Sequence, residues 1–283
     1  MRRPILGYAL LAPFGLILAG LLLVPAGQFL AYSFLSPVPF GVRFSPTLAN
    51  YRQVLADPSF WNLFRNSLTV AGMTAVLAVP IGYLLALHLR FSSGRDRVPL
   101  LMLTVVAVLG GYLVRLYAWR ILLGTNGILA SVLSFLGLPL SWPERVLFTR
   151  SAVVIALVNA YIPFVAVIAY GSLLDIGDDV LHAARDLGAR SAGVFGRVIL
   201  PLSGRALYGS FAIVFLLTAA DYVTPQLLGG AKGVMVGVAI YDQFVRLGNW
   251  PLGAAMSVVA VALTGVLVGA SWLVLRLAGV LRG

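Results

Sequence analysis

The sequence contains no cysteine and only two histidines among its 283 residues. The absence of cysteine excludes disulfide bridges and thiolate metal sites. His88 and His182 lie far apart and lack the closely spaced partners of a zinc site, so we expect neither a metal centre nor a cofactor. The sequence has no G-x-x-x-x-G-K-[ST] phosphate-binding loop and no nucleophile elbow. These absences predict a protein that is neither an ATPase nor another enzyme.

Charged residues are also scarce. They make up 10% of the chain, whereas hydrophobic residues make up 60% and the mean hydropathy is +0.99. A soluble domain typically has about a quarter of its residues charged. Several uncharged runs reach the roughly 20 residues that a helix needs to cross a bilayer. The alternating segments of about 10 residues that are typical of membrane barrels are not seen. The expected fold class is therefore an all-α integral membrane protein.

The uncharged runs predict about six transmembrane helices. The first follows two arginines but far exceeds the roughly 7–15 apolar residues of a signal peptide, so we expect a retained helix. Pro80 is expected to kink the second helix. The segment 124–143 is interrupted by Gly, Asn, Ser and Pro, which indicates a surface or re-entrant segment. The expected spans are 5–35, 66–89, 98–114 or further, 151–174, 206–223 and 252–275.

The formal net charge of +11 is divided among short loops, which favours a role in membrane orientation over nucleic-acid binding. One set of alternate loops carries eleven of the twenty Lys and Arg residues in about 50 residues, and the other set carries nine in a longer stretch. The positive-inside rule therefore predicts that both termini and the segment 175–205 are cytoplasmic.

Residues 182–201 form a polar, arginine-bearing island, which we call the coupling island. Asp178 or Asp179 is expected to cap a helix that begins near Val180, and Gly188 is expected to end it. Its apolar surface would comprise Val180, Leu181, Ala183, Ala184 and Leu187.

Two further features of the coupling island point to a defined connection. Asp186 precedes Arg190 by four residues, the favourable order for a helical ion pair. Pro201 stands where the next membrane helix is expected to have its first turn. The alternative interpretation is an ordinary amphipathic helix that lies on lipid headgroups.

The spacing within the island resembles the EAA loop of bacterial ABC importer permeases. Ala183-Ala184 is followed after three residues by Gly188, after nine more by Val198, and then by Leu200-Pro201. The resemblance covers roughly residues 60–275. The segment 65–71 resembles the start of the permease core in this family. Segments that resemble the spermidine/putrescine branch are 114–119, 122–127, 221–230 and 249–255.

This resemblance implies a type I ABC importer permease fold in the bacterial cytoplasmic membrane. The implied partners are a cytoplasmic ABC ATPase dimer, a second homologous permease and an extracytoplasmic solute-binding protein. It also implies a first helix with an outer loop at 1–61, a permease core at 62–275 and a cytoplasmic tail at 276–283. The island of each permease would dock in a groove of an ATPase subunit, whose closure would drive the permeases from inward-open to outward-open.

The residues that the resemblance assigns to coupling are Asp178, His182, Ala183, Ala184, Arg185, Asp186, Gly188 and Ala189. His182 stands where the family usually has glutamate. A histidine can hydrogen-bond to the ATPase, but its charge near neutral pH is not fixed. Asp178, one turn earlier, is a candidate to replace the missing carboxylate.

Six residues are candidates for the solute pathway. Asp221 is expected near the outer end of the fifth helix, either contacting a cationic solute or capping and pairing locally, for example with Arg115 or Lys232. Arg115 would repel a cation, so it is expected to pair with an acid or to serve an anionic solute. Aromatic rings either attract an ammonium group or anchor the helices at the membrane interface. The other candidates are the aromatic residues Tyr161, Tyr222 and Trp119 and the more solvated Asp242.

Two alternatives to polyamine import remain open. The first is an ABC permease for iron, a phosphonate or an opine. The second is a standalone secondary transporter, which would often show ionisable residues at mid-membrane and repeated halves.

Gly265 and Gly269, four residues apart in the sixth expected span, are expected to allow close helix packing.

Overall fold

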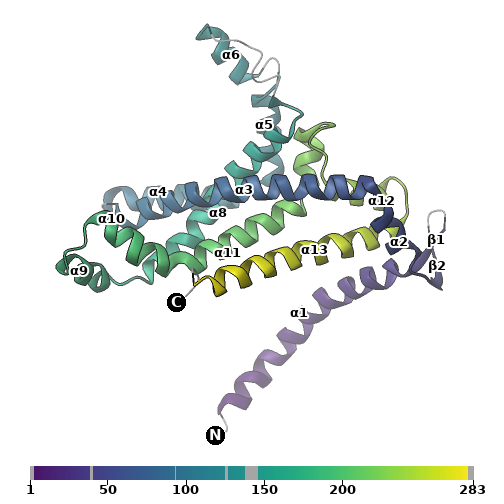
Figure 1. The fold of residues 1–283 in the computed structure, drawn as a ribbon, viewed down its shortest axis with the longest axis horizontal. Coiled ribbons are helices and arrows are strands. Elements are labelled where there is room, and N and C mark those ends of the chain that lie inside the picture. Colours follow the sequence, from purple (N-terminus) through teal and green to yellow (C-terminus); the bar gives the residue numbers. More distant parts are fainter. Residues whose placement is uncertain (1–2, 39–40, 93, 125–126, 138–145, 280–283) are drawn as a thin grey trace. The chain divides into compact units, whose positions relative to one another are not determined.

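The computed structural model describes residues 3–38, 41–92, 94–124, 127–137 and 146–279. Most of these residues are helical (Figure 1). The elements up to the middle of the chain are α1 (Arg3–Ser33), β1 (Leu35–Val38), β2 (Gly41–Pro46), α2 (Ala49–Ala56), α3 (Pro58–Phe91), α4 (Gly94–Leu109), α5 (Tyr112–Leu122) and α6 (Ile128–Phe135). They are followed by α8 (Arg150–Leu174), α9 (Asp178–Asp186), α10 (Ser191–Val194), η1 (Phe195–Ile199), α11 (Leu200–Ala219), η2 (Pro225–Gly229), α12 (Val236–Val245) and α13 (Trp250–Leu277).

The membrane-spanning helices agree with the prediction at five positions. Among the described residues, five helices are long and apolar enough to span a membrane, and a bent pair raises the number to six. The expected third span is wrong as a single helix. Helix α4 ends at Leu109, and α5 starts at Tyr112 with a bend of 93°. Gly110 and Gly111 occupy the break, and Gly111 is the N-cap residue of α5 with φ −57° and ψ 122°.

The fifth span begins earlier than predicted. Helices α10 and α11 and the π-helical turn η1 form one helical run, Ser191–Ala219. Pro201 lies in the first turn of α11, as expected. Proline cannot donate a backbone hydrogen bond. In the turn just before it, the amide of Leu200 donates to Phe195 O, five residues back, so the wider π-helical turn precedes the proline within an unbroken helix.

Two connecting segments differ in how far they can be compared with the prediction. The segment expected at 124–143 contains α6, while 125–126 and 138–143 lie outside the described residues. The all-α prediction missed a small antiparallel hairpin, in which β1 pairs with β2 through Ser36 opposite Arg43 and Pro37 opposite Val42. The hairpin is short and lies between α1 and α2, so the sequence contains no long alternation of apolar and polar residues that would have predicted it.

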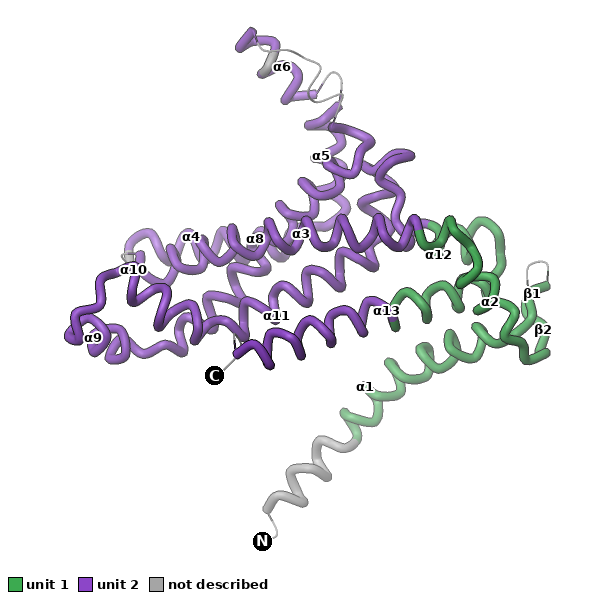
Figure 2. Tube along the Cα trace, in the orientation of Figure 1, with its two compact units in different colours: residues 1–61, 239–262 green, residues 62–238, 263–283 purple. Residues whose placement is uncertain are grey.

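The chain divides into two compact units (Figure 2). Unit 1 comprises residues 1–61 and 239–262. Within it, the side-chain amide of Asn50 on α2 donates to Ser33 O at 3.0 Å and to Leu35 O at 2.8 Å, which ties α2 to the end of α1 and the hairpin. Trp250 at the start of α13 packs edge-on against Phe244 on α12, so the first part of α13 also belongs to this unit.

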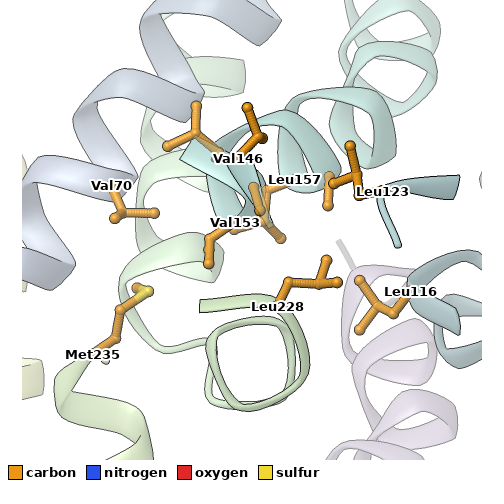
Figure 3. Packing of buried hydrophobic residues seen from close by; sticks show 11 residues of the cluster. Val70, Leu116, Leu123, Val146, Val153, Leu157, Leu228 and Met235 are labelled. Atoms are coloured by element: carbon orange, nitrogen blue, oxygen red, sulfur yellow. The ribbon is translucent and has the colours of Figure 1, made fainter. Parts of the chain in front are cut away.

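Unit 2 comprises residues 62–238 and 263–283 and contains the candidate coupling and pathway residues other than Asp242. Helix α8 packs against α4 and α11. At one end of this unit, apolar residues from α3, α5, α8 and the segment after η2 form a shared core (Figure 3). Its labelled members are Val70, Leu116, Leu123, Val146, Val153, Leu157, Leu228 and Met235.

Helices α3 and α8 approach each other closely at Gly82. A Cβ atom there would lie 2.7 Å from Val165 Cβ and 2.8 Å from Ile162 O. By contrast, a Cβ at Gly265 or Gly269 would meet nothing within 4 Å. Within the described residues, no segment of this chain closes on that glycine pair, so its packing role stays a prediction.

Candidate functional site

Helix α9 is the short helix that the coupling island was expected to contain. It begins at Asp178, two residues before the predicted start, and Gly177 occupies the N-cap position without a side-chain cap hydrogen bond. The prediction that Asp178 or Asp179 caps the helix is therefore wrong. Both carboxylates lie in the first turn, where they still suit the positive end of the helix dipole.

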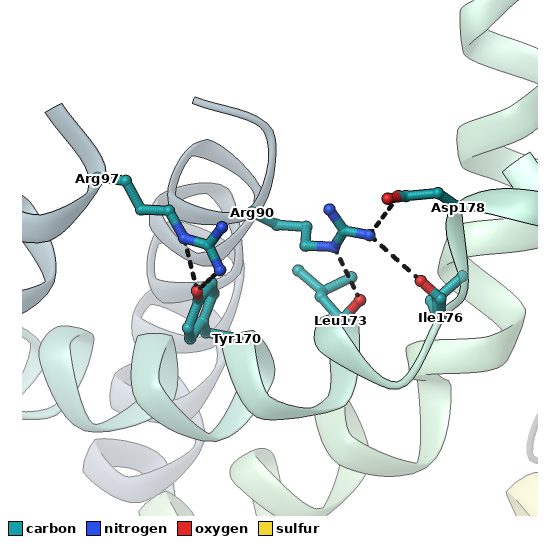
Figure 4. A network of polar contacts seen from close by, with 6 residues as sticks. All are labelled: Arg90, Arg97, Tyr170, Leu173, Ile176 and Asp178. Carbon is teal, nitrogen blue, oxygen red and sulfur yellow. Dashed lines mark hydrogen bonds and ion pairs between the residues drawn. The ribbon is translucent and has the colours of Figure 1, made fainter. Parts of the chain in front are cut away.

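Arg90, at the end of α3, connects this helix to the rest of unit 2 (Figure 4). Its guanidinium donates to Leu173 O at 3.2 Å, to Ile176 O at 3.3 Å and to the Asp178 carboxylate at 2.5 Å. The carbonyls belong to the end of α8 and the residues after it, where helical acceptors are left without intrahelical donors. The Arg90 guanidinium thus donates to carbonyls at the C-terminal end of α8 and to a carboxylate in the first turn of α9.

A second arginine reinforces the same end of α8. Arg97 on α4 donates through its guanidinium to the Tyr170 hydroxyl and lies over the Tyr170 ring, 5.4 Å from its centroid. Figure 4 shows the two arginines side by side against α8. The C-terminal end of α8 is consequently held by α3 and α4 together.

Gly188 ends α9 as predicted. Its φ of +84° lies in the left-handed region, which side chains other than Gly and Asn rarely adopt. The amide of Ala189 donates to Ala184 O at 3.1 Å and that of Gly188 to Arg185 O at 2.8 Å, which is the Schellman pattern. The chain therefore reverses sharply between α9 and the helical run that begins at Ser191.

The apolar residues of α9 do not all face outward. Leu181 is buried, and Ala184 and Ala189 pack against the core at this end of unit 2. Val180 and Leu187 are exposed, the latter by 88%. The exposed residues of α9 and the turn also include Asp179, His182, Ala183, Arg185, Asp186 and Gly188. The surface free for another protein is thus narrower than predicted.

The predicted ion pair between Asp186 and Arg190 is wrong. Helix α9 ends at Asp186, and Arg190 is already the N-cap of α10. The turn at Gly188 separates them, so the four-residue spacing no longer places them on one helical face.

Asp221 follows the end of α11. Its Oδ1 accepts from the amides of Val223 at 2.9 Å and Thr224 at 3.4 Å, and its Oδ2 accepts from the Tyr112 hydroxyl at 2.8 Å. Tyr112 is also 2.6 Å from Thr224 Oγ1, which must donate because the tyrosine proton is already used. In the part of the chain that the structure describes, Asp221 has no ion pair with Arg115 or Lys232. Local capping is confirmed, while the carboxylate keeps its charge uncompensated.

Arg115 does not pair with an acid within the described ranges. Its guanidinium donates to Ala107 O and, at 3.4 Å, to Ala160 O. Ala107 lies in the last turn of α4, whose carbonyls lose their helical donors at the break before α5. The arginine therefore caps the break, a use that the predicted straight span did not suggest.

The remaining pathway candidates fall into different environments. Tyr161 on α8 and Trp119 on α5 both pack on the core of Figure 3, and Trp119 also donates to Asn159 Oδ1 at 3.3 Å. Tyr222 is 40% exposed. Asp242 belongs to unit 1 and pairs with Arg246 at 3.1 Å.

Sequence reasoning missed three residues of these networks. Tyr112 and Thr224 hold Asp221, and Arg90 holds α9. The Gly110-Gly111 pair before Tyr112 and the polar Thr224 three residues after Asp221 were local signals of a break and a cap. Arg90 had no such signal, because its partners lie more than 80 residues away.

A comparison with models of protein families finds no match. Individual relatives are nevertheless clear. The chain is 34% identical to the spermidine/putrescine transport system permease protein PotB of Escherichia coli over 231 residues, 82% of this chain and 83% of the relative. It is 34% identical to PotB of Haemophilus influenzae over 247 residues, 87% and 86% of the two chains. The E. coli inner membrane ABC transporter permease protein YdcU is 31% identical, covering 77% and 72%.

Solved structures agree in fold. A bacterial ABC transporter that imports the acidic polysaccharide alginate matches with a TM-score of 0.74 at 15% identity, covering 97% of this chain and 96% of that one. The MetNI methionine ABC transporter in an inward-facing conformation matches with a TM-score of 0.56 at 17% identity, covering 79% and 94%. With both sequence and fold in agreement, the chain belongs to the spermidine/putrescine-type branch of the ABC importer permeases, as a multi-pass subunit of the inner membrane.

Proposed function

We propose that this permease carries a polyamine of the spermidine/putrescine class and that the uncompensated carboxylate of Asp221 contacts the cationic solute. The printed function of the PotB relatives supports the solute class. The observation that supports Asp221 as the solute contact is that its carboxylate has no positively charged partner among the described residues. Of the two acids among the pathway candidates, Asp242 is paired with Arg246, while Asp221 receives only neutral donors among the described residues.

Neutral donors suit a cation site. A buried ion pair would already satisfy the carboxylate, and a solute ammonium would have to displace the resident cation. The Tyr112 hydroxyl and two backbone amides instead orient the carboxylate and leave its negative charge for the solute. The aromatic face of Tyr161 offers additional cation–π attraction. Among the described residues, Arg115 contacts the carbonyls of Ala107 and Ala160 and makes no ion pair with Asp221, so its guanidinium does not occupy the proposed cation site.

The proposed assembly contains a cytoplasmic ATPase dimer, a second homologous permease and an extracytoplasmic solute-binding protein. One related fold, the alginate transporter, is described in complex with a periplasmic protein bound to an alginate pentasaccharide. Both termini of this chain and α9 would face the cytoplasm, as the distribution of Lys and Arg predicts.

Coupling would proceed through α9. The exposed Val180, Ala183 and Leu187 form the surface offered to the ATPase, with His182 in the position of the family's glutamate. Arg90 fixes the start of α9 to α3 and α8, and the Gly188 turn leads directly into the helical run Ser191–Ala219. A displacement of α9 by the ATPase would therefore be transmitted to membrane helices as a rigid connection.

The experiment is ATP-dependent uptake of radiolabelled spermidine and putrescine by vesicles containing the complete complex. Gly188→Val places a β-branched residue at φ +84° in otherwise open space, whereas Gly188→Asn retains a residue that tolerates this conformation. Gly196→Ala, in the same island without positive φ, is the matched control. We expect Gly188→Val to abolish uptake while the complex still assembles, and the other two variants to retain most of it.

Three outcomes would contradict parts of this proposal. Import of iron, a phosphonate or an opine in place of polyamines would overturn the solute. Uptake without an ATPase would indicate a standalone transporter. Full uptake by Gly188→Val would overturn the role of the α9 turn in coupling.

A further inference from the structure

A basic pocket of about 410 Å³ lies between α11 and the last part of α13, within unit 2. Its lining residues are Arg205, Tyr208, Trp272 and Arg276. None of them belongs to the proposed coupling surface or solute pathway. The pocket thus brings two guanidinium groups and an indole ring together.

Tyr208 holds the two helices together at this pocket. Its hydroxyl lies 2.7 Å from Val268 O and 2.8 Å from Ser271 Oγ, and Ser271 Oγ also lies 2.8 Å from Val268 O. The helices run in opposite directions in Figure 1. Arg205, one turn before Tyr208, and Arg276, one turn after Trp272, are consequently brought to the same end of the helix pair.

The pocket carries two positive charges without a compensating acid. Arg276 lies over the Trp272 ring, 5.1 Å from its centroid, which orders the side chain through cation–π attraction. Among the residues that the structure describes, no ion pair involves Arg205 or Arg276. Guanidinium groups bind phosphate oxygens in a bidentate manner, so two of them around one cavity suit a phosphate-bearing anion.

The position along α13 places this cavity at the level of lipid headgroups. Trp250–Leu277 has 28 residues, or about 42 Å at a rise of about 1.5 Å per residue, close to a bilayer thickness of about 40–45 Å with headgroups. Arg276 is in the last turn. The exposed Leu273 and Leu277 on α13 and Leu202 on α11 offer apolar surface beside the pocket. Tryptophan is itself enriched at this depth.

We propose that the pocket binds the headgroup phosphate of an anionic phospholipid, with its acyl chains along the neighbouring apolar surface. The anionic lipid neutralises the arginine pair and links α11 to α13 at their shared end. This inference does not depend on the transported solute, because none of the residues that line the pocket belongs to the Asp221 network or to α9.

The test uses the complete complex purified in mild detergent and analysed by native mass spectrometry after addition of phosphatidylglycerol or phosphatidylcholine. Variants are Arg205→Gln, Arg276→Gln and their combination. Arg197→Gln, an exposed arginine of η1 that does not line the pocket, is the matched control. We expect wild type and the control to retain phosphatidylglycerol preferentially, each single variant to bind it about tenfold more weakly, and the double variant to lose the preference. Unchanged melting temperatures would show that the variants fold.

Other outcomes would overturn the proposal. Equal retention of phosphatidylglycerol by the double variant would exclude the arginine pair as its site. Competition by inorganic phosphate at equal strength, without preference between the two lipids, would identify a free-anion site. Loss of a subunit from the double-variant complex, with lipid retention unchanged, would assign the pocket to a protein contact.

Discussion

Two polar networks in unit 2 differ in whether their central charged group has a partner of opposite charge. At the end of α8, the Arg90 cation is surrounded by the carbonyls of Leu173 and Ile176 and the Asp178 carboxylate. After α11, the Asp221 anion is surrounded by a tyrosine hydroxyl and two amides. The first network includes both signs of charge, whereas the second includes one.

The difference indicates different tasks. A guanidinium that satisfies a helix end and pairs with a carboxylate makes a closed and rigid joint. A carboxylate oriented by neutral dipoles keeps a negative potential that a mobile cation can still use. The contrast supports a mechanical role at α9 and a solute-binding role at Asp221.

The largest effect is expected from Arg90→Leu. This variant leaves the Leu173 and Ile176 carbonyls and Asp178 without their donor, at a cost of roughly 1.5–3 kcal/mol for hydrogen bonds to a charged group. ATP-dependent uptake should fall more than about tenfold, since about 1.4 kcal/mol already corresponds to that factor. Arg95→Leu, at an exposed arginine of α4, is the control and should transport normally. Equal uptake in the two variants would mean that the joint at α9 is dispensable.

The next largest effect is expected from Asp221→Asn. Asparagine retains an oxygen for the two amides but removes the charge. The KM for spermidine should rise about tenfold with little change in maximal rate, because binding to a cation is lost while the cap remains. Asp242→Asn, at a carboxylate already paired with Arg246, is the control. An unchanged KM with a lowered melting temperature would leave Asp221 with a capping role alone.

A smaller effect is expected from Tyr112→Phe. It removes the donor to Asp221 and the acceptor of Thr224, each worth about 1 kcal/mol in a typical hydrogen bond. Uptake at low spermidine concentration should fall about fivefold as the carboxylate loses its orientation. Tyr117→Phe changes an exposed tyrosine of α5 and should leave uptake unaltered. A similar loss in both variants would point to a general effect on α5.

The smallest effect is expected from Arg246→Gln. Arg246 and Asp242 form a surface pair four residues apart, and such pairs contribute about 0.3–0.5 kcal/mol. The melting temperature and spermidine KM of the complex should change little. A large rise or fall in KM would show that the paired carboxylate of Asp242 also contacts the solute, and the contrast with Asp221 would weaken.

The spans and the coupling turn were predictable because they depend on neighbours in the chain. Long uncharged runs marked α3, α8 and α13, and Gly188 marked the end of α9. The α4–α5 break was not predicted, because hydropathy averages over the apolar residues on both sides of it. The cap of α9 was also misplaced, since Asp178 bonds instead to an arginine 88 residues away.

The sequence by itself determined that this protein spans the membrane as helices and carries a spacing that resembles the coupling loop of ABC importer permeases. Hydropathy and local backbone preferences depend on residues that are adjacent in the chain, so the sequence alone is enough to predict them. Only the tertiary structure decided which charges are neutralised. Arg90 and Asp178, Tyr112 and Asp221, and Arg205 and Arg276 come together through helix packing. Electrostatic energy depends on distance in space, which the order of residues does not contain.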